Sequence, residues 1–231
     1  MTQFKDIKHI FFDLDDTLWD FERNSSGVLQ QLYHEFELKD KLRVEFADFH
    51  IQYKTINSDL WKQYNRGSIS KQELRNNRFH NTFRSFHYDN FEENMRMTEE
   101  YLLRSPHGTH LHEGCHEVLS FLQSKYKLHI ITNGFSEVQS IKLKNCNLSS
   151  YFNEIIISEV HRVNKPDLRI FRISEELTGA KPQECLMIGD NYETDIEGAS
   201  AAGWNTLWFR PNQTEQIENS LSSLLELKEL L

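Results

Sequence analysis

The stretch Phe11-Phe12-Asp13-Leu14-Asp15-Asp16-Thr17 places two carboxylates directly after an apolar run. The run over residues 9–12 is short and ends in acid, which is typical of a buried strand. In an extended segment, residues two apart point to the same side, so the carboxylates of Asp13 and Asp15 are expected to lie on the same side of the chain. Two such carboxylates repel each other unless a cation or a proton lies between them. A divalent ion with oxygen ligands meets that need, and Mg²⁺ is the ion that we expect.

Three further segments follow an apolar run with a group that can bind phosphate. They are Ile130-Ile131-Thr132-Asn133-Gly134, Asn164-Lys165-Pro166-Asp167 and Ile188-Gly189-Asp190-Asn191-Tyr192-Glu193-Thr194-Asp195. Each comes directly after a predicted strand or lies in the loop that leads on from one. In an open parallel sheet, ligands bind beyond the carboxyl ends of the strands. Segments that are distant in the sequence can therefore meet in one site.

Five short apolar runs are candidate strands, and helical patterns lie between them. The runs cover residues 9–12, 128–131, 155–157, 186–188 and 206–209, and the helical patterns cover 116–122, 137–144 and 169–177. A chain that alternates strands with helices builds a parallel sheet covered on both faces. The sequence therefore predicts an α/β fold with a Rossmann-like parallel sheet core.

The C-terminal stretch is predicted to be a helix that packs on the sheet. One helical stripe holds its apolar residues, which are Ile217, Leu221, Leu224, Leu225 and Leu231. A helix that binds a partner is the alternative interpretation of such a stripe.

The connection between the first two predicted strands is far longer than an ordinary crossover. It contains four stripes of apolar and aromatic residues at helical spacing, which we interpret as the core of a helix bundle. The stripes are Val28, Leu29, Leu32, Tyr33 and Phe36; Leu60, Trp61 and Tyr64; Phe79, Phe83 and Phe86; and Met97, Tyr101 and Leu102. We therefore predict an α/β core over residues 1–17 and 111–231, which holds the catalytic site, and an inserted α-helical domain over 18–110.

Net charge indicates which partners the chain can bind, and cysteine content indicates where the protein is located. The 231 residues include 26 Lys and Arg against 35 Asp and Glu, a net charge of −9. An acidic chain is a poor general binder of polymeric nucleic acid or of anionic membranes, and no stretch approaches the ~18 apolar residues of a membrane span. Cys115, Cys146 and Cys185 are odd in number and far apart, which favours reduced thiols and a cytoplasmic location. We expect a small-molecule partner, with monomer and homodimer both open.

In their order and in the residue type at each key position, the four segments resemble the motifs of the haloacid dehalogenase (HAD) superfamily, specifically its magnesium-dependent phosphatases. The resemblance implies a helical cap domain in the long insertion and Mg²⁺ as the cofactor. It assigns Asp13 as the nucleophile that forms an aspartyl-phosphate. It assigns Asp15 as the general acid for the leaving oxygen and then the general base for the hydrolytic water, with its backbone carbonyl on the metal.

The same resemblance gives roles to the other three segments. Thr132 and Asn133 bind phosphate oxygens at the start of the following helix, and Lys165 neutralises Asp13 together with the incoming phosphate. Asp190 is a direct metal ligand, whereas Asp195 holds water or Lys165. Simpler interpretations exist for each group: a turn that only caps a helix for the first segment, a solvated surface lysine, and a helix N-cap for Asp195.

One position departs from the family pattern. Relatives commonly carry a glycine three residues before the lysine, and this chain has Arg162 there. The backbone conformation of that loop is therefore an open question, although Arg162 adds positive charge near the expected site.

The acid at position 15 and the insertion narrow the reaction. Dehalogenases and phosphonatases of the superfamily lack an acid at that position, so Asp15 favours phosphate-ester hydrolysis or phosphomutase chemistry. Within the insertion, Leu60-Trp61, the run from Arg66 to Arg75, and Arg78-Phe79 resemble the cap of bacterial pyrimidine nucleotidases of the YjjG/YfnB branch. That resemblance implies a nucleoside 5′-monophosphate substrate, of the pyrimidine series.

Alternatives remain for the substrate and for its binding residues. A sugar-phosphate phosphatase, a phosphomutase related to β-phosphoglucomutase, and a non-catalytic phosphate-binding module on the same fold stay open. Trp19 and Phe21 could stack on a base, with packing between the domains as the plainer interpretation. Arg66 and Arg78 could meet phosphate or sugar, with surface salt bridges as the plainer one.

Overall fold

The computed structural model describes residues 4–211, 213, 215 and 217–231, and this part of the chain forms one six-stranded parallel sheet. The strands are β1 (His9–Phe12), β2 (Lys127–Thr132), β3 (Glu154–Ile157), β4 (Cys185–Gly189), β5 (Asn205–Phe209) and β6 (Ser220–Leu221). Their spatial order is β3-β2-β1-β4-β5-β6. The α/β fold is confirmed, and each of the five predicted strands agrees with the structure to within one residue at either end.

The order of the strands reverses at β1. From β1 the chain adds β2 and β3 on one side, and then returns to place β4 on the other side of β1. Such a switch point opens a crevice at the carboxyl ends of the central strands, where ligands bind in open α/β sheets. The ends of β2, β1 and β4 are therefore adjacent, and each of them leads into one of the predicted motifs.

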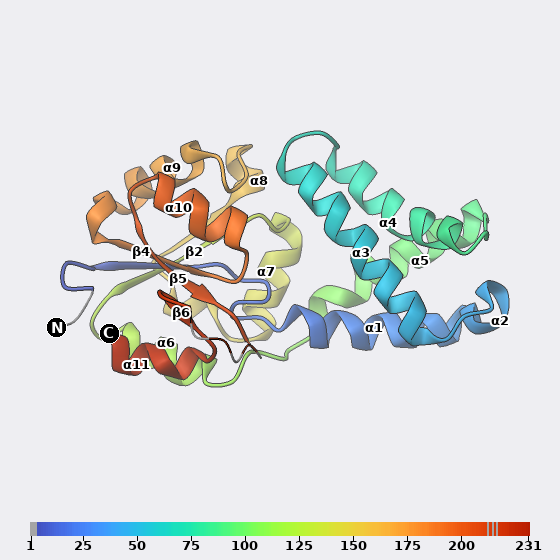
Figure 1. Cartoon of the computed structure of the whole chain (residues 1–231), viewed down its shortest axis with the longest axis horizontal. Coiled ribbons are helices and arrows are strands. Elements are labelled where there is room, and N and C mark those ends of the chain that lie inside the picture. Colours follow the sequence, from blue (N-terminus) through green and yellow to red (C-terminus); the bar gives the residue numbers. More distant parts are fainter. Residues whose placement is uncertain (1–3, 212, 214, 216) are drawn as a thin grey trace. The chain divides into compact units, whose positions relative to one another are not determined.

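Helices cover both faces of the sheet (Figure 1). The helices are α6 (Cys115–Leu122), α7 (Ser136–Asn145), α8 (Ser158–His161), α9 (Leu168–Thr178), α10 (Gly198–Ala201) and α11 (Leu227–Leu230). Residues of α6, α7 and α11 pack in one hydrophobic cluster, and residues of α9 and α10 in another on the opposite face. The strand β1 contributes side chains to both clusters, because successive residues of a strand point to opposite faces of the sheet. Ile10 and Phe12 belong to the first cluster and Phe11 belongs to the second.

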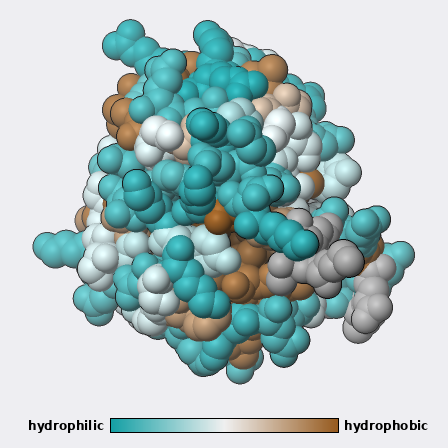
Figure 2. Space-filling model, turned by 90° about the vertical axis from the view of Figure 1, so that its left-hand side faces the viewer, coloured by the Kyte–Doolittle hydropathy of each residue, from teal (hydrophilic) through white to brown (hydrophobic). Residues whose placement is uncertain are grey.

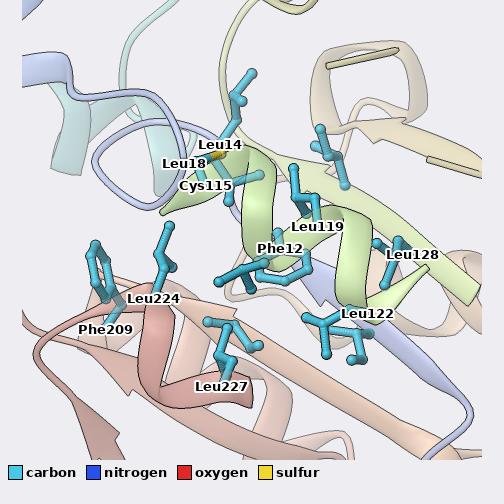
Figure 3. Packing of buried hydrophobic residues seen from close by; sticks show 14 of the residues in the cluster. Phe12, Leu14, Leu18, Cys115, Leu119, Leu122, Leu128, Phe209, Leu224 and Leu227 are labelled. Atoms are coloured by element: carbon cyan, nitrogen blue, oxygen red, sulfur yellow. The ribbon is translucent and has the colours of Figure 1, made fainter. Parts of the chain in front are cut away.

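The first cluster packs β1 against helices of one face of the sheet. Phe12 from β1 lies among Leu119 and Leu122 of α6 and Leu227 of α11 (Figure 3). All four side chains are fully buried, and burial of each stabilises the fold by about 1.5–3 kcal/mol relative to exposure. The segment after β1 therefore begins at a strand end that is held in the core.

The predicted C-terminal helix is wrong. Ser220–Leu221 forms the edge strand β6, which pairs with β5, and a 3₁₀ turn at Leu224–Glu226 leads into the four-residue α11. Ser223 caps that turn by accepting a hydrogen bond from the Leu225 amide. Leu221, Leu224 and Leu227 are nevertheless buried in the core, so three short elements pack these apolar residues in place of one helix.

The chain divides into two compact units, one made of the residues up to Phe21 together with Thr109–Leu231, and one made of Glu22–Gly108. The helices α1 (Phe21–Glu35), α2 (Leu38–Leu42), α3 (Phe46–Asn65), α4 (Lys71–Ser85) and α5 (Phe91–Arg104) make up the second unit, apart from the first residue of α1. This unit has its own core, in which Tyr53, Phe79, Phe83 and Tyr101 are buried. The aromatic stripes of the insertion are thus helical, and the role of the unit as a cap stays a prediction.

The surface on one face of the molecule agrees with the polar composition of the chain. Most of the face shown in Figure 2 is hydrophilic, and its hydrophobic residues gather mainly in one patch toward its lower part. Among the residues described, no helix has both the length and the apolar character that crossing a membrane would need.

Candidate active site

The site begins where three adjacent strands end. Asp13 follows β1, Thr132 is the last residue of β2, and Asp190 follows β4. The Asp13 amide donates a hydrogen bond of 2.9 Å to the Ile188 carbonyl, which continues the pairing of β1 with β4 beyond the strand. Backbone pairing therefore fixes the position of Asp13 independently of the contacts that its side chain makes.

Lys165 joins this group from the loop after α8. Its Nζ donates to Asp13 Oδ1 at 2.7 Å and to Asp195 Oδ1 at 2.6 Å. Only 1% of Lys165 is exposed, so the interpretation of a solvated surface lysine is wrong. A buried ammonium between two carboxylates is stable because each charge has a partner.

Asn133 fixes the backbone of that lysine. Its Oδ1 accepts hydrogen bonds from the Lys165 amide and from Ser158 Oγ, each 2.8 Å long, and its Nδ2 donates to the Lys165 carbonyl at 2.9 Å. The Asn133 side chain thus holds Lys165, and a direct contact of Asn133 with phosphate stays a prediction.

Asp195 lies inside a π-helical turn, Tyr192–Glu197, and is buried. Besides Lys165, it accepts hydrogen bonds from the Asn191 amide (3.1 Å) and Thr194 Oγ1 (3.2 Å). The N-cap of the turn is Asn191, whose Oδ1 accepts from the Thr194 amide, so the alternative that Asp195 is a helix cap is wrong. Gly189 permits this arrangement, because a Cβ there would lie 2.2 Å from Asp195 Oδ2.

Asp190 is held at two points. Its Oδ1 accepts a hydrogen bond of 3.0 Å from Thr17 Oγ1, and its backbone carbonyl accepts one of 2.7 Å from Trp208 Nε1 on β5. Burial raises the pKa of Asp190, and the carboxylates of Asp13, Asp195 and Asp16 raise it further.

Three carboxylates thus converge on one point. Oxygen atoms of Asp13, Asp190 and Asp195 all lie within 4.8 Å of one another. Burial raises the pKa of Asp13 to about 7, although the Lys165 ammonium lowers it, and Asp195 and Asp15 add to the rise. Burial alone would lower the pKa of Lys165, but the Asp13 and Asp195 carboxylates outweigh it and raise that pKa.

This cluster suits a small divalent cation. One ammonium offsets one negative charge, so the buried carboxylates of Asp13 and Asp195 together with the partly buried Asp190 leave negative charge without compensation. All of the converging donors are hard oxygen atoms, which Mg²⁺ prefers. The residues present therefore fit the magnesium ion that the sequence predicted.

Asp15 has different partners from Asp13. Its Oδ1 forms an ion pair with Lys142 Nζ, and its Oδ2 accepts a hydrogen bond of 2.8 Å from Gln139 Nε2. The strand ends at Phe12, so the alternation of a strand does not extend over the following turn, and the carboxylate cluster around Asp13 is completed by Asp190 and Asp195. That Asp13 and Asp15 both hold the ion stays a prediction. The cation next to the Asp15 carboxylate is Lys142.

Thr132 presents its hydroxyl in a defined way. Its Oγ1 accepts hydrogen bonds from the Gly134 amide at 3.1 Å and from Gln139 Nε2 at 2.8 Å. Both lone pairs are therefore occupied, and the hydroxyl hydrogen is left to be donated. A hydroxyl hydrogen that is free to be donated is what a phosphoryl oxygen requires.

Sequence reasoning gave no role to Thr17, Gln139 or Lys142. All three are buried polar residues. The feature of the sequence that could have identified them is a polar residue at a position where a buried side chain is usually apolar. Two residues considered for substrate contact are also buried. The Trp19 ring belongs to the hydrophobic core, and Arg78 in the second unit lies over the Tyr101 ring, so a surface salt bridge at Arg78 is wrong.

Comparisons with known proteins find relatives that match most of this chain. The family model of the haloacid dehalogenase-like hydrolases matches residues 7–203. The pyrimidine 5′-nucleotidase PynA of Streptococcus pneumoniae is 32% identical over 210 residues, which are 90% of this chain and 86% of the relative. The pyrimidine 5′-nucleotidase YjjG of Escherichia coli is 32% identical over 228 residues, which are 96% of each chain.

A solved structure shares the whole fold. The crystal structure of the putative HAD-hydrolase YfnB from Bacillus subtilis, bound to magnesium, superposes with a TM-score of 0.86 at 29% identity and covers 98% of this chain and 99% of its own. The residues that the family model matches include Asp13, Thr132, Lys165 and Asp190. This chain therefore belongs to the haloacid dehalogenase-like hydrolases.

Proposed function

We propose that this enzyme is a Mg²⁺-dependent phosphomonoester hydrolase that acts through an aspartyl-phosphate at Asp13, with a pyrimidine nucleoside 5′-monophosphate as its substrate. The observation that carries the proposal is the convergence of Asp13, Lys165, Asp190 and Asp195 at the carboxyl ends of β1 and β4. The names of its relatives support the nucleotide part of the proposal.

The ion would be held by the carboxylates of Asp13 and Asp190 and by the backbone carbonyl of Asp15. When bound, Mg²⁺ supplies positive charge that offsets the charge on the phosphoryl oxygens. Asp195 would contribute by holding Lys165 in place.

In the first step, an Asp13 carboxylate oxygen attacks phosphorus while the ester P–O bond breaks in line with the attack. Asp15 gives a proton to the leaving oxygen, so that a neutral alcohol departs. The Lys165 ammonium and the Thr132 hydroxyl donate to the phosphoryl oxygens and fix their orientation.

In the second step, water attacks the phosphorus of the aspartyl-phosphate and Asp15 accepts its proton. The bond between phosphorus and Asp13 breaks, which releases inorganic phosphate and restores the free carboxylate. One residue, Asp15, thus acts first as the acid and then as the base.

The substrate is tested by measuring inorganic phosphate released from a panel of nucleoside 5′-monophosphates and hexose phosphates in the presence of Mg²⁺. We expect the highest kcat/KM with uridine and thymidine 5′-monophosphates. Hydrolysis of hexose phosphates alone would contradict the nucleotide proposal and favour a sugar-phosphate phosphatase. Interconversion of hexose phosphates without net phosphate release would favour a phosphomutase.

The metal site is tested apart from activity by thermal unfolding. Mg²⁺ at about 100 times its Kd should stabilise the wild-type protein by about 2.7 kcal/mol. Asp190→Asn should lose most of this gain, whereas Asp89→Asn, at an exposed position of the second unit, should keep it. An equal Mg²⁺ response in wild type and Asp190→Asn would remove Asp190 from the metal site.

A further inference from the structure

The helix α7 buries two polar side chains that the proposed chemistry does not use. Gln139 is 0% exposed and Lys142 is 4% exposed, whereas Lys144 on the same helix is exposed. Residues three apart on a helix lie on one face, and both of these side chains reach Asp15. A buried amide and a buried ammonium are costly unless each has a defined partner.

The two side chains bind opposite oxygens of one carboxylate. Lys142 Nζ pairs with Asp15 Oδ1, and Gln139 Nε2 donates to Asp15 Oδ2 at 2.8 Å. Two partners on a single rigid helix fix the plane of the carboxylate as well as its position. The ammonium is itself held, since it lies 4.1 Å from the centroid of the Trp19 ring.

Gln139 also links Asp15 to the predicted phosphate-binding group. Its Nε2 has two hydrogens, and they go to Asp15 Oδ2 and to Thr132 Oγ1, each at 2.8 Å. The amide therefore has one orientation that satisfies both acceptors. Gly134 leaves room for it, because a Cβ there would lie 2.1 Å from Gln139 Nε2.

The ion pair is open on the side of the acid. The side chain of Lys142 is 5% exposed and that of Asp15 is 29% exposed. A pair that served only the stability of the core would have no need to leave its carboxylate accessible. In this ion pair, Lys142 is the buried partner, and Asp15, which must reach a substrate, is the accessible partner.

We propose that Lys142 and Gln139 are positioning residues that hold Asp15 in place for proton transfer to the leaving oxygen, an inference that rests on the proposed phosphatase function. Neither residue needs to touch the substrate. Their effect depends on the leaving group, because an alkoxide must be protonated as it departs and a nitrophenolate need not be.

The test compares two esters in single-turnover and steady-state assays, using wild type, Lys142→Met, Lys142→Arg, Gln139→Leu and the control Lys144→Met. With uridine 5′-monophosphate, Lys142→Met and Gln139→Leu should lower the rate of the first turnover by about 10- to 100-fold at nearly unchanged KM. With p-nitrophenyl phosphate, the first release of nitrophenolate should stay within about threefold of wild type. Lys142→Arg should recover part of the loss, and Lys144→Met should match wild type.

Equal losses with both esters would show a merely structural role and overturn the inference, as would no loss with either. Circular dichroism identifies a variant that has not folded, in which case Lys142→Arg and Gln139→Leu carry the comparison. If the wild-type protein hydrolyses neither ester, the proposed function fails and this role fails with it. If the wild type hydrolyses both and the leaving-group effect is absent, this role alone fails.

Discussion

The arrangement around Lys165 shows how much one buried residue can organise. Its ammonium joins Asp13 to Asp195, and its backbone is fixed by Asn133. The sequence predicted that Lys165 and these acids would meet, because each motif follows a predicted strand of a parallel sheet and the four motifs match the family in order and residue type. The contacts of Gln139 and Lys142 with Asp15 were beyond sequence reasoning, since a polar residue within a helical pattern is usually solvated.

Arg162 is a second case at this scale. Family members commonly have glycine at this position, and Arg162 adopts φ 57° and ψ 32° at the end of α8, in the left-handed region. Arg162 therefore has the left-handed backbone conformation that a glycine at this position would favour. It adds strain, because a side chain in that region is disfavoured.

We therefore predict that Arg162→Gly stabilises the protein by about 1 kcal/mol. Arg162 is exposed, so the loss of its side chain removes no core contact. Urea unfolding followed by circular dichroism measures the change. The control is Arg169→Gly, a substitution in the first turn of α9, which should destabilise by about 1 kcal/mol. Destabilisation in both variants would contradict the strain argument.

At the scale of elements, β1 and β2 carry a buried histidine pair. His9 Nδ1 and His129 Nε2 are 3.1 Å apart, and the His129 ring also stacks on Phe11. Burial lowers the pKa of His129 to about 3, with the charges of His9 and Lys127 lowering it further. The folded sheet thus keeps His129 neutral under conditions in which an unfolded chain protonates it.

This pair predicts a loss of stability in acid. Above about pH 6.5 neither state binds the proton, and below it the unfolded chain gains a proton that folded His129 does not. Stability should therefore fall as the pH drops from about 6.5 toward 3, by about 1.4 kcal/mol per pH unit for this residue. His129→Gln should remove that part of the slope in urea unfolding, whereas His116→Gln, at an exposed site, should keep it. Identical slopes in wild type and His129→Gln would contradict the prediction.

Two elements show why sequence patterns stop short of the structure. The C-terminal apolar stripe had helical period, yet Ser220–Leu221 pairs with β5 and the chain enters a helix only after Ser223. A free sheet edge competes with local helix propensity, and the sequence contains no direct signal for that edge. The π-helical turn Tyr192–Glu197 is similar, because it contains Asp195, whose hydrogen bond with the distant Lys165 is not visible in the local sequence.

At the scale of the whole molecule, the chain has separate hydrophobic cores in its two units. The alternation of strand and helix predicted the first unit, and four aromatic stripes predicted the second as a helix bundle.

Separate cores predict separate effects of core mutations. Phe79→Ala should destabilise Glu22–Gly108 by about 3–5 kcal/mol, since Phe79 is fully buried among Tyr53, Phe83 and Tyr101. Phe91→Ala, at a residue 69% exposed, should cost less than about 0.5 kcal/mol. Urea unfolding measures both, and isothermal titration should still detect Mg²⁺ binding by folded Phe79→Ala, because the carboxylate cluster lies in the other unit. Loss of Mg²⁺ binding in that folded variant would contradict the independence of the site.

The central claim, covalent capture of phosphate at Asp13, is tested most directly by rapid acid quench of the enzyme during turnover of a ³²P-labelled nucleoside 5′-monophosphate. Protein-bound label should appear within the first turnover, be released by hydroxylamine as an acyl-phosphate is, and map by mass spectrometry to the peptide that contains Asp13. Asp13→Asn should carry no label and should lose about 10³-fold or more of the turnover. Full turnover by the wild type with no labelled protein at any quench time, or unchanged turnover by Asp13→Asn, would contradict the account.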